Sequence, residues 1–256
     1  MGGVRDLPAS ATEADGSVVV RVLSYNVRSM RDDVAALGRV ITACRPDVVC
    51  VQEAPRFFRW RKAAARLARS SGLVYVSGGA TASGPMILCS LRAHVEHTED
   101  VLLPRTPGLH QRGFATAVLR WGRAARLGVL SCHLSIDERE RYEQGRLLLE
   151  RLSALDVPHA VAGGDVNDRP DGRTFGLLAG ALQDGWATRP WGREHTTRLG
   201  DPLQRIDAVF ATRGVEVLGC GVPMGLAGVH EEDLRAATDH LPVLAALRVP
   251  AAAETG

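Results

Sequence analysis

At six places along the chain, a strand-like apolar run ends in, or is closely followed by, a polar side chain that can bind a cation or carry a proton. In chain order they are Asn26, Glu53, His133, Asp165 with Asn167, Asp207, and Asp239 with His240. Carboxylate and amide oxygens are ligands for a hard cation such as Mg²⁺, and histidines and carboxylates transfer protons. Because strand ends are where sites are assembled in α/β folds, the pattern predicts one site that combines a cation with acid–base chemistry.

Each of these residues has an ordinary structural explanation when it is taken alone. Asn26 could form a turn or cap a helix, and Glu53 could be a solvated residue after a strand. Asp165 follows two glycines and could make an Asx turn, while Asp207 could pair with Arg205. The histidines could be core residues held by backbone groups. Only the joint occurrence of the six positions favours a shared site.

The elements that must position these residues are short β-type runs, often followed by a turn and a helical stretch. Apolar runs predict strands at 18–25, 47–51, 73–77, 86–91, 114–121, 126–132, 159–162, 205–211 and 242–247. Helical periodicity predicts helices at 33–44, 57–70, 138–154 and 174–180. Hairpins mixed with strand–helix units favour an α/β (α+β) fold with mixed sheets and helices outside. We expect one domain over 18–249, a flexible N-terminal tail at 1–17 and a C-terminal tail at 250–256.

The composition says little about what the chain binds. The formal net charge is +2, and Lys62 is the only lysine, so arginine supplies nearly all of the positive charge. The five cysteines are scattered without a CxxC pair, which predicts buried reduced thiols rather than a zinc site or a disulfide framework. The apolar runs are too short for a membrane helix, and residues 1–16 hold no signal-peptide core. We therefore expect a cytoplasmic location, and we also expect a monomer.

The same polar residues lie in short sequence blocks that resemble a known family. In chain order the blocks are Ser24-Tyr25-Asn26, Gln52-Glu53, His133-Leu134, Gly164-Asp165-Val166-Asn167, Arg205-Ile206-Asp207 and Asp239-His240-Leu241-Pro242. Each block is weakly specific alone. Their order, and their span over nearly the whole chain, resemble the endonuclease/exonuclease/phosphatase superfamily.

This resemblance implies a four-layer α-β-β-α sandwich with two packed mixed β-sheets and a site in a cleft at one edge. It implies that Glu53 is the principal metal carboxylate, with Asn26 beside it and Asp239 near the metal. The implied cofactor is Mg²⁺, for which Mn²⁺ can substitute.

The resemblance also implies the catalytic residues. His240 matches the catalytic histidine and Asp207 the carboxylate hydrogen-bonded to it. Asp165 and Asn167 match the pair that orients the attacking water and touches the phosphate, and His133 matches a second histidine that contacts the substrate in many branches. A neutral His240 would itself take the proton from water, whereas a cationic His240 would stabilise charge and leave Asp165 as the base. The sequence leaves both open, and we favour His240 slightly.

The substrate is less well defined. The chain lacks the tyrosine-x-proline-asparagine pattern of abasic-site repair enzymes, and two of its blocks differ from those of inositol polyphosphate phosphatases. It looks more like the deoxyribonuclease/sphingomyelinase-like branch. We expect a metal-dependent phosphoester hydrolase, foremost a phosphodiesterase or nuclease with nucleic acid as its substrate. The alternatives are a phosphatase or phosphodiesterase of a small metabolite or lipid head group, and a non-catalytic binding module on the same fold.

Two further features are candidates for contact with a substrate. The basic segment 56–69 contains Phe57, Phe58 and Trp60 and follows Glu53 closely. It is either a platform for a phosphate backbone or an amphipathic helix with its aromatic residues in the core, and we favour the helix. His195 precedes the Arg205 block, where family members often have polar residues on the substrate side.

Overall fold

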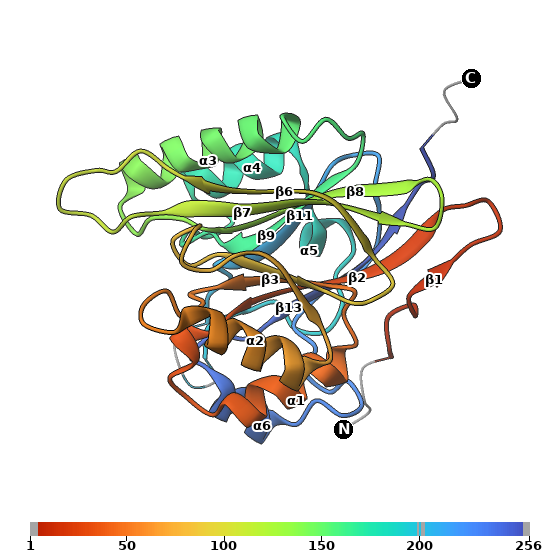
Figure 1. Ribbon diagram of the computed structural model, residues 1–256, viewed down its shortest axis with the longest axis horizontal. Helices are drawn as coiled ribbons and strands as arrows, with labels where there is room; N and C mark the ends of the chain where they lie inside the picture. Colours follow the sequence, from red (N-terminus) through yellow and green to blue (C-terminus); the bar gives the residue numbers. More distant parts are fainter. Residues whose placement is uncertain (1–4, 199, 201–202, 253–256) are drawn as a thin grey trace.

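The computed structural model describes residues 5–198, 200 and 203–252, and its elements form four layers (Figure 1). Two mixed β-sheets lie face to face, and helices cover both outer faces. The predicted α-β-β-α sandwich is therefore confirmed.

The first sheet has seven strands, and its central strands carry the first two sequence blocks. The order is β12-β13-β2-β3-β5-β4, and β1 pairs with β2 outside this path. The strands are β1 (Ala11–Thr12), β2 (Val18–Asn26), β3 (Val48–Gln52), β4 (Val74–Gly78), β5 (Met86–Cys89), β12 (Glu216–Gly221) and β13 (Val243–Val249).

The second sheet has six strands in the order β10-β11-β9-β8-β7-β6. They are β6 (His94–Leu102), β7 (Gly113–Trp121), β8 (Ala125–His133), β9 (Ala160–Asp165), β10 (Gln183–Asp184) and β11 (Asp207–Ala211). The helices of the chain are the 3-10 helix Arg28–Met30 and α1 (Val34–Cys44), α2 (Trp60–Ser71), α3 (Glu138–Ser153), α4 (Arg173–Ala181), α5 (Gly185–Thr188) and α6 (Glu231–Ala237). None of the helices among the described residues is long and apolar enough to span a membrane.

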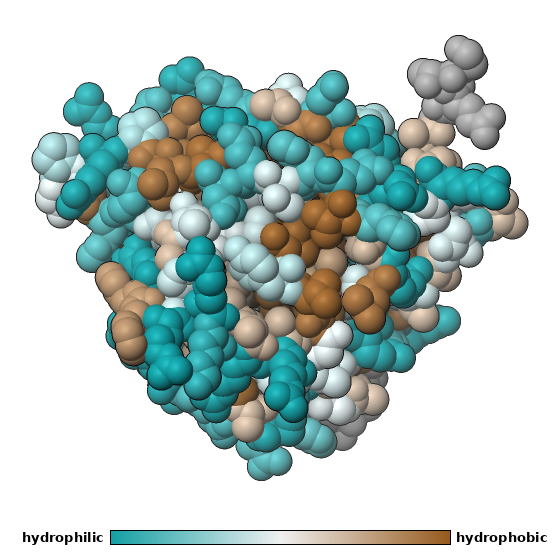
Figure 2. All heavy atoms as spheres, viewed as in Figure 1, coloured by the Kyte–Doolittle hydropathy of each residue, from teal (hydrophilic) through white to brown (hydrophobic). Residues whose placement is uncertain are grey.

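The apolar side chains form three core layers that hold the sandwich together. One layer lies between the first sheet and α1, α2 and α6, the second between the two sheets, and the third between the second sheet and α3 and α4. Hydrophilic residues cover most of the face shown in Figure 2, and the exposed hydrophobic residues form small separate groups. These five helices therefore bury one apolar side on a sheet and leave their polar side in water.

Two parallel strand pairs bring distant blocks to one edge of the sandwich. In the first sheet β2 and β3 are parallel and Asn26 lies opposite Gln52, so Glu53 follows at the same edge. In the second sheet β8 and β9 are parallel and His133 lies opposite Asp165. The carboxyl ends of parallel strands share an edge, which explains why these four positions converge although they are far apart in the sequence.

Antiparallel neighbours complete this edge. The first residue of β11, Asp207, lies opposite Asp165, the last residue of β9. In the same way β13 runs antiparallel to β2, with Val243 opposite Ser24. The block that holds His240 therefore enters β13 at the edge where β2 ends.

Several elements differ from the sequence-based expectations. The strands β6 and β12 and the helix α6 were not predicted. The predicted helix at 57–70 begins only at Trp60, because Arg59 before it has a left-handed backbone conformation with φ of 59°. As a result Phe57 and Phe58 are 79% and 92% exposed, so the interpretation that placed these two rings in the core is wrong.

The described parts of the two expected tails contact the domain. β1 pairs with β2, Leu7 is buried, and Asp6 forms an ion pair with Arg21 at 2.9 Å. Near the other end, the N–H of Ala252 donates to the carbonyl of Ala124 at 3.0 Å. Residues 6–12 are thus attached to the first sheet, where a flexible tail was expected.

Candidate active site

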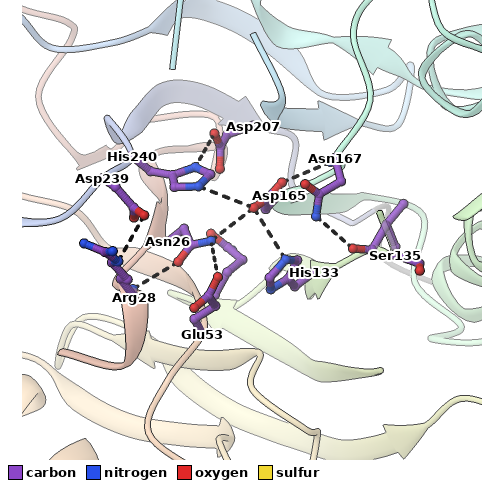
Figure 3. A network of polar contacts seen from close by, with 12 residues as sticks. Asn26, Arg28, Glu53, His133, Ser135, Asp165, Asn167, Asp207, Asp239 and His240 are labelled. Atoms are coloured by element: carbon purple, nitrogen blue, oxygen red, sulfur yellow. Dashed lines mark hydrogen bonds and ion pairs between the residues drawn. The ribbon is translucent and has the colours of Figure 1, made fainter. Parts of the chain in front are cut away.

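Asp165 lies at the centre of a polar network at this edge (Figure 3). Its Oδ2 accepts a hydrogen bond from Asn26 Nδ2 at 3.0 Å, and it lies 3.5 Å from His133 Nε2 and 3.8 Å from His240 Nε2. Its Oδ1 accepts from the N–H of Asn167 at 3.0 Å. That bond is the Asx turn considered from the sequence, so the turn and the site coexist in one residue. Burial, together with the nearby negative charge of Asp207, raises the pKa of Asp165.

His240, which is partly buried, forms a pair with the buried Asp207 beside Asp165. His240 Nδ1 lies 2.9 Å from Asp207 Oδ2, within hydrogen-bond distance. Burial alone would lower the pKa of His240, but the charge and the hydrogen bond of Asp207, with help from Asp165 and Asp239, raise this pKa to about 10. At neutral pH the imidazole is therefore cationic. The alternative that Asp207 pairs with Arg205 is wrong, since Arg205 is ion-paired with Asp184 at 2.9 Å.

His133 has the opposite electrostatic character. It is buried on the other side of Asp165, and burial lowers its pKa to about 4 despite the attraction of the Asp165 charge. It is therefore neutral at pH 7. Two histidines that contact the same carboxylate thus differ in charge, because only His240 has a second carboxylate as a partner.

Glu53 and Asn26 are hydrogen-bonded to each other next to this network. Asn26 Nδ2 donates to Glu53 Oε1 at 3.2 Å, and Asn26 Oδ1 accepts from the N–H of Arg28 at 3.0 Å. Glu53 directly follows β3 and has a positive φ of 51°, a strained conformation for a residue with a side chain. Such backbone strain clusters at functional sites.

Asp239 is held by neighbours that the sequence did not indicate. Its Oδ2 is ion-paired with Arg28 Nε at 3.1 Å, and its Oδ1 accepts from Thr238 Oγ1 at 3.2 Å. Thr238 Oγ1 also lies 3.0 Å from the carbonyl of Asn26, which connects this loop to the end of β2. The described contacts thus place Asp239 on Arg28, at the outer side of the network (Figure 3).

Thr196 is a positioning residue that sequence reasoning missed. Its Oγ1 accepts from the N–H groups of Ile206 and Asp207, both at 3.1 Å, and its carbonyl accepts from the N–H of Leu241. It therefore holds the segments of Asp207 and His240 together. Among the contacts of the described residues none joins the neighbouring His195 to the network. The only sequence signal was the polar stretch around residue 195, and it pointed to the adjacent residue.

Three residues of this network are arranged in a way that could hold a metal ion. Asp165, Asp207 and His240 each offer a ligand atom, and these atoms lie within 4.8 Å of one another. The carboxylate of Glu53 is a second candidate, with the amide nitrogen of Asn26 beside it. All but one of the predicted site residues, the exception being His195, therefore meet at one edge of the sandwich.

Comparison with known proteins identifies the family. The model of the Endonuclease/Exonuclease/phosphatase family matches residues 23–240. The chain belongs to this family. The match begins in β2 and ends at His240, so it includes all the residues of the network. No curated protein matches the chain.

Solved structures of low sequence identity share the fold. A family member from Bacteroides vulgatus superposes with a TM-score of 0.74 at 18% identity, over 90% of this chain and 99% of the other. A mannosyl-6-phosphatase from Bacteroides thetaiotaomicron gives 0.72 at 19% identity, over 89% and 99%. Truncated TDP2 from Caenorhabditis elegans gives 0.67 at 16%, over 90% and 97%. At these identities the likeness concerns the fold and not the substrate.

Proposed function

We propose that the chain is a magnesium-dependent phosphoester hydrolase that acts foremost on phosphodiesters. One observation carries the proposal, namely that a cationic His240 paired with Asp207 faces Asp165 within 3.8 Å, and that the carboxylate of Glu53 lies beside this group and is hydrogen-bonded to Asn26. Family membership supports phosphoester hydrolysis in general.

The donor set of Glu53 and Asn26 fits the implied cation. The carboxylate of Glu53 is a ligand that Mg²⁺ prefers, and Glu53 is only partly buried and lines a pocket. Asn26 directs its Nδ2 toward Glu53 and its Oδ1 toward the N–H of Arg28, so its amide would have to turn to offer the oxygen to the cation. When bound, Mg²⁺ neutralises a phosphate oxygen and the charge that develops on the leaving group. Asp239 would have to exchange Arg28 for the cation, so its role as a metal ligand stays a prediction.

We assign the cluster of Asp165, Asp207 and His240 to acid–base chemistry and not to the metal. His240 Nδ1 already contacts Asp207, and a pKa of about 10 leaves no free ring lone pair at neutral pH. A cationic His240 stabilises negative charge on the phosphoryl group. Asp165, whose pKa is raised, is then the residue that takes the proton from the attacking water. We thus prefer Asp165 as the base, although the sequence slightly favoured His240.

The remaining predicted residues are assigned to the substrate. Asn167 has a positive φ of 52°, and its Nδ2 donates to the carbonyl of Leu134 at 3.0 Å, which fixes the amide at the end of β9. His133 is neutral and buried, so it can donate a hydrogen bond to a phosphate oxygen without adding charge. His195 has no observed link to the network and stays a prediction from the sequence alone.

A phosphatase of a small metabolite is the second candidate, because the same fold also occurs in a mannosyl-6-phosphatase. The deoxyribonuclease/sphingomyelinase-like branch, the cytoplasmic location and the monomeric state remain predictions. Turnover of bis(p-nitrophenyl) phosphate, of p-nitrophenyl phosphate and of supercoiled plasmid, each with Mg²⁺ and with EDTA, separates these possibilities. We expect Mg²⁺-dependent cleavage of the diester and the plasmid.

Variants connect this turnover to the site. His240→Ala should abolish cleavage, whereas His97→Ala, an exposed histidine on β6, is the matched control and should not. Turnover of the monoester alone would favour the metabolite phosphatase. If the purified protein cleaved no phosphoester with Mg²⁺, the non-catalytic binding module would replace the proposal.

A further inference from the structure

A small pocket flanks the network on the side of Glu53 and His133. Its volume is about 260 Å³, and both residues form part of its wall. Asp165, Asp207 and His240 are not among its lining residues, so the pocket lies beside the acid–base residues and does not contain them. The other titratable residues of its wall are all basic, namely Arg31, Arg56, His110 and Arg112.

Neutral groups hold Arg56 in this pocket. Its Nη1 donates to Ser83 Oγ at 3.0 Å and lies 3.3 Å from the Ser83 carbonyl. The Ser83 hydroxyl in turn donates to the carbonyl of Gln111 at 2.8 Å, in the loop that leads to β7. These contacts fix the orientation of the guanidinium but leave its charge without a counter-ion.

Arg112 also lines the pocket and forms no ion pair among the described residues. Its Nε is buried without a hydrogen-bond partner within the described part of the chain, and burial lowers its pKa against the attraction of Asp165 and Glu53. Arginines elsewhere on the same sheet are paired, as Arg120 and Arg126 are with Glu96 at 2.8 and 2.7 Å. A desolvated, unpaired cation is costly, and an anion that enters the pocket would remove this cost.

The charge of the pocket selects its ligand. The wall of the pocket includes three arginines and one carboxylate residue, Glu53. Planar guanidinium groups bind phosphate oxygens with two parallel hydrogen bonds. The volume is below the range typical for a complete drug-sized ligand, so it suits one substituent of a larger substrate.

We propose that this pocket binds a second phosphate group of the substrate, next to the phosphoester held at Glu53. The proposal rests on the proposed function for the identity of the substrate, but not for anion binding itself. The second phosphate comes either from a neighbouring position of a nucleic-acid strand or from a small bisphosphate. Recognition through Arg56 and Arg112 then makes the enzyme prefer substrates with two phosphates.

Binding of inorganic phosphate tests the pocket without catalysis. Calorimetric titration of the full chain with phosphate in EDTA should show a site that Arg56→Gln and Arg112→Gln weaken by about 10- to 100-fold, the range for charge-assisted hydrogen bonds. Arg56→Lys should restore part of the affinity. Arg66→Ala, an exposed residue of α2, is the matched control and should not change it. Phosphate binding that His240→Ala removes and the arginine variants leave intact would overturn the proposal.

Kinetics with Mg²⁺ test the preference for two phosphates. If the second phosphate belongs to a strand, the dinucleotide pTpT should have a kcat/KM at least about tenfold above that of TpT. If it belongs to a small molecule, the kcat/KM of fructose 1,6-bisphosphate should exceed that of fructose 6-phosphate by a similar factor, the contribution of charge-assisted hydrogen bonds. A preference for pTpT over TpT assigns the second phosphate to a nucleic-acid strand. A preference for the fructose bisphosphate over the monophosphate assigns it to a small molecule. Arg112→Gln should reduce the ratio toward one. Equal rates in both pairs would overturn the proposal even if hydrolysis is observed, whereas phosphate binding without any hydrolysis would contradict only the proposed function.

Discussion

The Asp207→Asn variant tests the electrostatic basis of the proposed chemistry. The substitution keeps the size of the side chain but removes the negative charge 2.9 Å from His240 Nδ1. The pKa of His240 is about 10 against an ordinary value of 6.5, a difference that corresponds to about 5 kcal/mol in favour of the protonated ring. Asp207 makes the largest favourable contribution, and without it burial should lower the pKa of His240. A smaller fraction of the rings is then cationic at neutral pH.

The assay is the pH dependence of kcat with bis(p-nitrophenyl) phosphate and Mg²⁺. In the wild type, activity should persist on the alkaline side until the pH approaches about 10, where His240 loses its proton. In Asp207→Asn the rate at pH 7.5 should fall by a factor of about 10²–10⁴ and partly recover at lower pH as the ring is protonated again. A kcat of the variant within a few-fold of the wild-type value at pH 7.5 would refute the reasoning. A loss of kcat by the same factor at every pH would also refute it.

The stability of the same variant gives a second readout. Because the pKa of folded His240 lies above the ordinary value of 6.5, the pair stabilises the fold fully below about pH 6.5. This stabilisation is lost as the pH rises through about 10. Urea unfolding should therefore show that the free energy of unfolding of the wild type declines between these two pH values, and that the decline is smaller in Asp207→Asn.

Three other predictions concern stability and the metal. His133→Asn should make the fold less sensitive to acid. His133 is protonated near pH 6.5 in the unfolded chain but only near pH 4 in the folded one, so through this residue the free energy of unfolding of the wild type should fall by about 2 kcal/mol between pH 7.5 and 5. Urea unfolding at these two pH values measures the fall, which should be absent in the variant. Gly163→Ala should destabilise by about 1–3 kcal/mol, because the new methyl group would lie 2.9 Å from the Cβ of Cys50 on the facing sheet, and an unchanged melting temperature would contradict the tight packing. Glu53→Gln should raise the Mg²⁺ concentration for half-maximal activity by about tenfold or more, since a carboxylate ligand is lost, and an unchanged Mg²⁺ titration would exclude Glu53 as a ligand.

Much of the site was accessible from the sequence because its residues directly follow strands. Asn26 and His133 end their strands, and the parallel pairing of those strands with their neighbours brings these ends to one edge. By contrast, the side chains that modify the site come from loops whose positions depend on tertiary contacts. Nothing in the local sequence shows that Arg112 would be buried without a partner, or that Arg28 would contact Asp239.

The fold was predicted best where hydrophobic periodicity was strong. The strand β6 reads His94–Leu102 with four charged or histidine side chains among its first six residues, and it lies exposed at the edge of its sheet, so it lacks an apolar pattern. The helix α6 has only seven residues and begins with three acidic ones. Its burial against α1 decides its structure, and such tertiary stabilisation is not visible in a local window.

The site also depends on how the two sheets are aligned. Glu53 and Asn26 come from the first sheet and His133, Asp165 and Asp207 from the second, so neither sheet alone contains the chemistry.

Directly below the site, buried polar groups connect the two sheets. Ser131 Oγ of β8 donates to the carbonyl of Val51 in β3 at 2.9 Å, and Gln52 Nε2 lies 3.4 Å from Ser131 Oγ and 3.5 Å from the carbonyl of Gly163. An apolar contact would allow the sheets to slide, whereas directional hydrogen bonds in a dry interior have one optimal position. Because Gln52 precedes Glu53, the bond that aligns the sheets also fixes Glu53, the proposed metal ligand, relative to Asp165. The register between the sheets is therefore part of the geometry of the proposed site.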